Sequence, residues 1–132
     1  NRVNIIQTHS SEKLEIFKLN MNKADVVLVD APCSGLGVLR RNPAAKWHMN
    51  LNKIESLAFL QQKIIKKNAP LVKKGGALVY ATCSILKQEN ESQIEAFLKT
   101  PEGKRFSLEK EKTYLAHKTG FDGFYIARLI AQ

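Results

Sequence analysis

Two short apolar segments in this chain are each followed by a cysteine, and this repeated pattern constrains the fold more than any other feature. Val26–Val29 is followed by Asp30 and Cys33, and Ala77–Ala81 is followed by Cys83. Short, partly β-branched apolar runs bounded by turn residues are typical of strands that are buried on both faces. Open α/β sheets bind ligands beyond the carboxyl ends of such strands. We therefore expect the carboxylate and both thiols to converge on one pocket at the carboxyl edge of a sheet.

Predicted strands and helices alternate along most of the chain, and a predicted hairpin closes it. This order predicts an α/β fold with a mostly parallel sheet, helices on both faces and an antiparallel edge. The length of 132 residues supports one domain, spanning 1–132, with a core of its own. The expected strands are residues 1–7, 25–30, 77–81, 106–108 and 124–130, and the expected helices are residues 12–19, 51–68 and 87–99.

Cysteine and histidine usage argues against several classes of protein. The two cysteines show no CxxC spacing, and His9, His48 and His117 are scattered, so the sequence predicts neither a disulfide framework nor a metal site. No signal-peptide pattern and no apolar run of bilayer length is present, so we expect a soluble, cytoplasmic protein with free thiols and no membrane partner.

The excess of 21 basic over 12 acidic residues fits either a polyanionic partner or simply a lysine-rich solvated surface. The positions of a few cations favour the first interpretation. Arg40, Arg41 and Lys46 follow the first cysteine turn closely, and Trp47 lies beside them in a long irregular passage from Gly35 to Asn50. Long loops in compact domains are often functional. We expect this one to be functional and to lie close to a polyanionic partner.

A free cysteine is most often a small buried hydrophobe, and for one cysteine alone that interpretation is the better one. Two cysteines in matched positions at strand ends, beside an aspartate, favour a functional site instead. Gly35-Leu-Gly37 also follows a strand, but Arg40 stands where the dinucleotide-binding pattern requires its last glycine, so that pattern fails.

The sequence resembles the NOL1/NOP2/Sun (Fmu-type) RNA cytosine-C5 methyltransferases. The resemblance covers nearly the whole chain from Asp25 onward, and it implies a Rossmann-like class I methyltransferase sheet, S-adenosyl-L-methionine as cofactor and an RNA partner, either ribosomal or transfer RNA. The motifs that carry it are Asp30-Ala-Pro-Cys-Ser-Gly35, Arg40-Arg-Asn-Pro43, Lys46-Trp47, Gly75-Gly76, Ala81-Thr-Cys-Ser84, Glu89-Asn90 and Asp122-Gly-Phe124.

The resemblance also implies roles for individual residues. Cys83 matches the nucleophile that adds to C6 of the target cytosine, and Cys33 matches the cysteine that assists release of the covalent adduct. Asp30 matches an aspartate that gives acid assistance at the cytosine ring and lies close to the cofactor. Four residues are then expected to hold phosphate, sugar or a base of the RNA: Arg40, Arg41, Lys46 and Trp47.

One part of the family pattern has no match in this chain. The glycine-rich cofactor loop is expected to precede Asn1, and residues 8–11 carry no acidic residue for the adenine end. We therefore expect the carboxyl-terminal part of a catalytic domain, incomplete at its amino-terminal side and a poor enzyme by itself. Two alternatives stay open: a DNA cytosine-C5 methyltransferase, with Cys33 as nucleophile, and a catalytically silent RNA-binding module.

Overall fold

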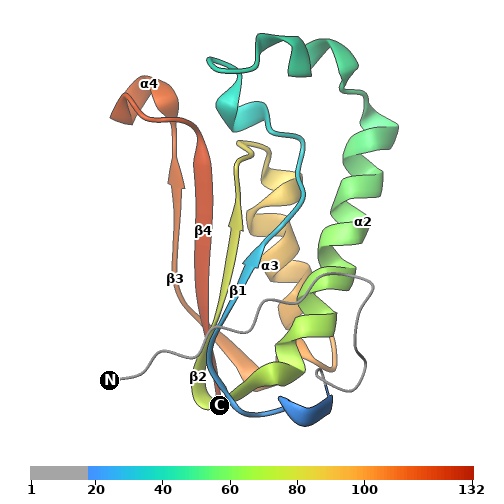
Figure 1. The fold of residues 1–132 in the computed structure, drawn as a ribbon, viewed down its shortest axis with the longest axis vertical. Helices are drawn as coiled ribbons and strands as arrows, with labels where there is room; N and C mark the ends of the chain where they lie inside the picture. Colours follow the sequence, from blue (N-terminus) through green and yellow to red (C-terminus); the bar gives the residue numbers. More distant parts are fainter. Residues whose placement is uncertain (1–17) are drawn as a thin grey trace.

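The computed structural model describes residues 18–132. Four strands within them form one sheet with the order β1-β2-β4-β3 (Figure 1). The pairings are parallel between β1 (Ala24–Asp30) and β2 (Val72–Thr82), and antiparallel on both sides of β4 (Phe124–Ala131). β3 (Phe106–Tyr114) therefore runs in the same direction as β1 and β2. A mostly parallel α/β sheet with an antiparallel last strand is confirmed. The strand expected over residues 1–7 and nearly all of the helix expected over 12–19 lie outside the described residues.

Two helices pack against one face of the sheet. α2 (Leu51–Asn68) begins where the Asn50 side chain accepts a hydrogen bond from the backbone N–H of Lys53, at 2.9 Å, as expected of a helix cap. α3 (Glu91–Leu98) follows a short 3-10 helix, η4 (Lys87–Glu89). Both helices contribute to the same core as the buried residues of the strands. We expected helices on both faces of the sheet, but in the described part of the chain these two helices cover only one face. That core contains Val29, Ile65, Leu78, Tyr80, Ile94, Phe97, Tyr125, Ala127 and Leu129.

The prediction that the first apolar strand is buried on both faces is wrong for the described structure. Val29 is buried against the helices, but Val26 and Leu28 on the opposite face are 61% and 65% exposed. α2 and α3 both pack on the side of Val29 instead. An apolar run indicates that a strand favours burial, but it does not say which elements cover each side.

The carboxyl ends of β1 and β2 lie at the same end of the sheet, and the connecting segments that follow these strands lie there too (Figure 1). The passage expected to be irregular contains two 3-10 helices, η1 (Leu36–Val38) and η2 (Pro43–His48). The connection from β3 to β4, which includes α4 (Ala116–Thr119), lies at the same end. Two further 3-10 helices, η3 (Ala69–Leu71) and η5 (Gly103–Arg105), lead into β2 and β3.

Candidate active site

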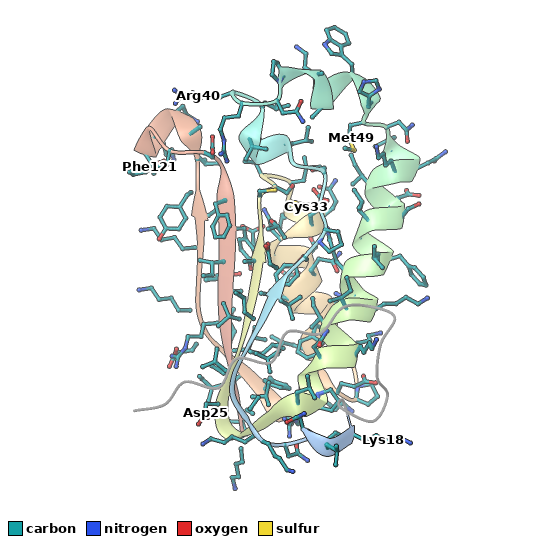
Figure 2. The ribbon with its side chains drawn as sticks, viewed as in Figure 1. Lys18, Asp25, Cys33, Arg40, Met49 and Phe121 are labelled. Atoms are coloured by element: carbon teal, nitrogen blue, oxygen red, sulfur yellow. The ribbon has the colours of Figure 1, made fainter. Side chains whose placement is uncertain are left out.

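The two cysteine turns meet at the carboxyl edge of the sheet. β1 and β2 are neighbours in register, with Asp30 opposite Ala81, and the pairing continues as the N–H of Ala31 donates to Ala81 at 2.9 Å. A turn follows the carboxyl end of each strand, and the sulfur of Cys33 in the first turn lies 3.2 Å from the sulfur of Cys83 in the second. Both cysteines are free thiols and half-buried (Figure 2 labels Cys33). Neighbouring parallel strands thus bring together two thiols that are fifty residues apart in sequence.

A fully buried carboxylate, that of Glu89, lies at the junction of the two turns and binds the serine that follows each cysteine. The Ser34 N–H donates to Glu89 Oε1 at 2.8 Å, and the Ser34 hydroxyl to Oε2 at 2.6 Å. The Ser84 hydroxyl also donates to Oε2, in a very short hydrogen bond. Gln61 of α2 adds a fourth hydrogen bond, from Nε2 to Oε1 at 3.2 Å. We call Ser34, Gln61, Ser84 and Glu89 the site floor.

The residue after Glu89 fastens the second turn further. The Asn90 side chain donates to the carbonyl of Ser84 at 3.0 Å and accepts from the Thr82 hydroxyl at 2.6 Å. The Tyr80 hydroxyl donates to the carbonyl of Glu89 at 2.6 Å. Sequence reasoning missed this arrangement. It noted Glu89 only as an acidic residue near a helix amino terminus and Glu89-Asn90 as part of the family resemblance, because no local pattern links a helix start to a turn 55 residues earlier.

Gly37 joins the first turn to two other loops through its backbone. Its N–H donates to the carbonyl of Cys83 at 2.9 Å, and its carbonyl accepts from the N–H of Gly123 at 2.7 Å. A Cβ at position 37 would lie 2.1 Å from the Gly123 carbonyl oxygen and 2.7 Å from that of Cys83. Only glycine allows these three backbones to approach so closely.

The surroundings of Cys33 keep its thiol protonated. Burial raises the pKa of the Cys33 thiol well above its ordinary value, and the hydrogen bond to Cys83 raises it further. A protonated Cys33 is able to donate its S–H to the sulfur of Cys83. Burial and the contact with Cys83 thus both act in the direction that keeps the proton on Cys33.

Asp30 ends β1 with an exposed side chain that makes no hydrogen bond or ion pair to any other described residue. Its carboxylate is free to accept a hydrogen bond from a ligand at the carboxyl edge, where α/β sheets bind their ligands. Within residues 18–132 this is the candidate residue for holding the cofactor that the resemblance implies, and an unpartnered acceptor at a strand end fits that use.

The four candidate RNA-binding residues are exposed and lie on the loops around the thiols, not in contact with them. Arg40 donates to the carbonyl of Gly120 at 3.2 Å, and Arg41 forms an ion pair with Asp122 at 2.6 Å. These contacts fasten residues 40–48 to residues 116–122, and we call the two stretches together the rim. Lys46 lies over the ring of Trp47, 4.9 Å from its centroid.

The rim contains a second exposed aromatic side chain that sequence reasoning missed. Phe121 is 76% exposed, close to the 78% of Trp47, and it lies at the same end of the molecule as Arg40 (Figure 2). No sequence pattern separates an exposed phenylalanine from a core one when it stands in a loop of ordinary composition.

Other kinds of site find no support in residues 18–132. That part of the chain holds no group of three or more His, Cys, Asp or Glu side chains placed to bind a metal ion. None of its helices combines the length and the apolar character needed to cross a bilayer.

Comparison with known protein families identifies the group to which these motifs belong. The family model described as 16S rRNA methyltransferase RsmB/F matches residues 2–130. The chain belongs to this family. The resemblance to the NOL1/NOP2/Sun methyltransferases is thereby confirmed, and the matched region includes both cysteine turns and the whole rim.

Individual relatives agree with the family model. A protein of Synechocystis named probable ribosomal RNA small subunit methyltransferase B is 44% identical over 119 residues, which cover 80% of this chain and 27% of that protein. NSun6 from Pyrococcus horikoshii, solved with SFG, gives a TM-score of 0.68 at 30% identity, over 79% of this chain and 29% of that one. A methyltransferase homolog from the same organism gives 0.75 at 27% identity, over 98% and 46%. The chain spans about a quarter of the length of the curated relatives it matches.

Proposed function

We propose that this chain carries the catalytic cysteines of an S-adenosyl-L-methionine-dependent RNA cytosine-C5 methyltransferase, and that its substrate is ribosomal RNA. The observation that carries the proposal is the pair of free thiols 3.2 Å apart at the carboxyl edge of the sheet. The family and the names of the relatives support ribosomal RNA over transfer RNA.

Cys83 is the nucleophile in this proposal. Its thiolate adds to C6 of the cytosine, a C6–S bond forms, and the electron pair of the C5–C6 double bond moves to C5. The raised pKa of Cys33 supports this assignment, because a thiol that keeps its proton is a poor nucleophile and a good donor to the neighbouring sulfur. Addition at C6 requires the base to be outside a helical stack.

When bound, S-adenosyl-L-methionine would supply the methyl group for C5 and leave as the demethylated thioether, which keeps the electron pair of the broken S–CH3 bond. In this proposal Asp30 holds the cofactor or gives acid assistance at the cytosine ring, and its exposed side chain, unpartnered within the described residues, supports that role. Release then needs transfer of the C5 proton to a solvent base. The electron pair of the C5–H bond re-forms the C5–C6 double bond, and the pair of the C6–S bond returns to the Cys83 sulfur. Cys33 is within 3.2 Å of that sulfur, and it assists this last step.

The rim is proposed as the RNA-binding surface. Arg40, Arg41 and Lys46 supply positive charge for phosphates, and Trp47 supplies a ring on which a base can stack. Phe121, held beside the first two by the Arg40 and Arg41 contacts, offers a second stacking surface.

The test is covalent trapping of the full-length protein on RNA that contains 5-azacytidine, in wild-type protein and in the Cys83→Ala and Cys33→Ala variants. We expect an adduct in the wild type and in Cys33→Ala, and none in Cys83→Ala. Tritiated methyl transfer to ribosomal and transfer RNA, measured in parallel, identifies the substrate.

The other outcomes select among the alternatives. An adduct lost only in Cys33→Ala would reject Cys83 as nucleophile and favour the mechanism of DNA cytosine-C5 methyltransferases. RNA binding without an adduct in any variant would reject the enzymatic role and leave an RNA-binding module. Methylation of transfer RNA alone would overturn the proposed substrate.

A further inference from the structure

We propose that Glu89 is a positioning residue, whose buried carboxylate sets the separation of the two thiols by binding the serine next to each. A role for Glu89 in catalysis rests on the function proposed above, whereas its effect on the separation of the two thiols does not. Glu89 makes no contact with either sulfur, and it acts through Ser34 and Ser84.

The two turns are joined to Glu89 in equivalent ways. Each cysteine is followed directly by a serine, and both serine hydroxyls donate to the same oxygen, Oε2. The two hydroxyl oxygens consequently lie 3.2 Å apart, matching the 3.2 Å between the sulfurs one residue earlier. One carboxylate oxygen therefore fixes the distance between the two Cys-Ser pairs.

The second carboxylate oxygen fixes the orientation of the first turn. Oε1 accepts from the Ser34 N–H at 2.8 Å and from Gln61, whose same amide nitrogen also donates to the Pro32 carbonyl at 2.9 Å. The backbone on both sides of Cys33 is thus held through Glu89 and Gln61. Within the described residues Glu89 has no cationic partner, so hydrogen-bond donors alone stabilise its buried carboxylate.

A structural role in the core does not account for this arrangement. Ile94 and Phe97 already bury the apolar face of α3, and a buried carboxylate costs free energy that an apolar side chain avoids. A carboxylate is the group that accepts four hydrogen bonds from two turns and a helix at one point. We infer that its advantage lies in alignment of the thiols.

The test is the rate at which Cys33 and Cys83 form a disulfide in the full-length protein treated with diamide. The two thiols lose two protons and two electrons to the N=N bond of diamide, which becomes a hydrazine, and peptide mapping by mass spectrometry follows the Cys33–Cys83 disulfide. This rate reports the proximity of the thiols and needs neither RNA nor cofactor.

We expect Glu89→Ala to slow disulfide formation about tenfold, because lost alignment lowers the effective concentration of one thiol at the other. Glu89→Gln retains an acceptor for the Ser34 N–H and offers its amide to the hydroxyls, so we expect at least partial rescue. Ser84→Ala removes the only hydrogen bond from its turn to the carboxylate, whereas Ser34→Ala leaves the Ser34 N–H bond. Ser84→Ala is therefore expected to slow the reaction more than Ser34→Ala.

Two controls separate alignment from general loosening. Ile94→Ala removes core packing on α3 without touching either turn, and Glu95→Gln removes an exposed charge from the same helix. Both are expected to react at the wild-type rate. An unchanged rate in Glu89→Ala, or an equal decrease in Ile94→Ala, would overturn the proposal. If Glu89→Ala does not fold, the two serine variants decide the question, and equal wild-type rates in both would overturn it.

The same variants, assayed on 5-azacytidine RNA, keep this proposal separate from the proposed function. Slower disulfide formation in Glu89→Ala, with an adduct in the wild type, supports both. Slower disulfide formation with no adduct even in the wild type supports the positioning role and rejects the enzymatic function.

Discussion

The site floor and the rim differ in almost every physical respect, although both surround the same pair of thiols. The floor is buried, and Glu89 accepts hydrogen bonds from donors on both turns and on α2. The rim is exposed, basic and aromatic, and a backbone carbonyl and one ion pair hold its two stretches together. The floor has the features of a scaffold that fixes reacting atoms, and the rim has those of a surface that meets a polyanion.

This difference predicts which substitutions affect which measurement. Changes in the floor should alter stability and thiol geometry, because buried groups there have no substitute partners. Changes in the rim should alter RNA binding and its salt dependence while stability stays constant, because exposed side chains contribute little to folding. Substitutions that break this separation would show that the two regions are one functional unit.

The largest effect is expected from Gly37→Ala. The new Cβ would meet the backbone of Gly123 at 2.1 Å, and backbone cannot move aside as a flexible side chain does. We expect the free energy of unfolding to fall by about 3 kcal/mol and the disulfide rate to fall with it. Urea unfolding followed by circular dichroism measures the first effect.

Gly75→Ala is the matched control for Gly37→Ala. A Cβ there would meet nothing within 4 Å, and only the left-handed φ of 77° opposes it. That conformation costs an alanine about 1 kcal/mol. Equal losses in the two variants would show that the close approach at Gly37 is not important for stability.

The strands and the long helix could be predicted from the sequence because their signals are local. The apolar run before Asp30 and the helix expected over residues 51–68, which is α2, each occupy one short window of sequence. β3 was expected only over residues 106–108 but extends from Phe106 to Tyr114. Its later residues include an exposed, charged stretch, and such a sequence does not show the alternation that identifies a half-buried strand.

The candidate site could be predicted only in part, for the same reason. Each Cys-Ser pair is visible because it follows a strand directly. Glu89, Gln61 and Gly37 are not, because their partners lie tens of residues away and only the folded chain brings them together. A glutamate is common at the start of a helix, and nothing in the sequence around Glu89 indicates that its side chain is buried.

The next largest effect concerns the protonation of Cys33. Since burial raises the pKa of its thiol, less thiolate exists at any given pH, and alkylation should reach half its maximal rate at a higher pH than for an ordinary cysteine. At pH 8 we expect alkylation of Cys33 by iodoacetamide to be at least about tenfold slower than in the urea-unfolded chain.

The pH profile separates protonation from access. Restricted access lowers the plateau of the rate, whereas a raised pKa moves its midpoint. In Cys83→Ala the hydrogen bond to the second thiol is gone but burial remains, so the midpoint should move only partly toward the ordinary value. A Cys33 midpoint at the value of the unfolded chain would contradict the proton-holding role.

A smaller effect, confined to binding, is expected from Trp47→Ala in the rim. Stacking of one base on an aromatic ring contributes about 1–3 kcal/mol, so we expect RNA affinity to fall about tenfold. The ring is 78% exposed, so the free energy of unfolding should not change. Fluorescence anisotropy with a labelled single-stranded RNA measures the affinity.

Phe59→Ala provides the control for Trp47→Ala. Phe59 is an exposed aromatic on α2 with Lys63 over its ring at 5.0 Å, which is nearly the arrangement of Lys46 over Trp47. It lies outside the rim, and its loss should leave RNA affinity unchanged. Equal weakening in both variants would show that any exposed aromatic beside a lysine binds RNA, and the rim would lose its special role.

The smallest effect is expected from Asp122→Asn, and its sign distinguishes the two regions most clearly. Asp122 neutralises Arg41 at 2.6 Å, so the substitution frees a cation in the rim and removes a negative charge beside it. We expect RNA affinity to rise about two- to threefold at low salt and the gain to disappear at high salt. Glu109→Gln removes the acidic partner of Arg128 in a similarly exposed ion pair between β3 and β4, and should leave affinity unchanged. If Asp122→Asn instead weakens binding, the ion pair holds the rim together, and order in the rim matters more than its net charge.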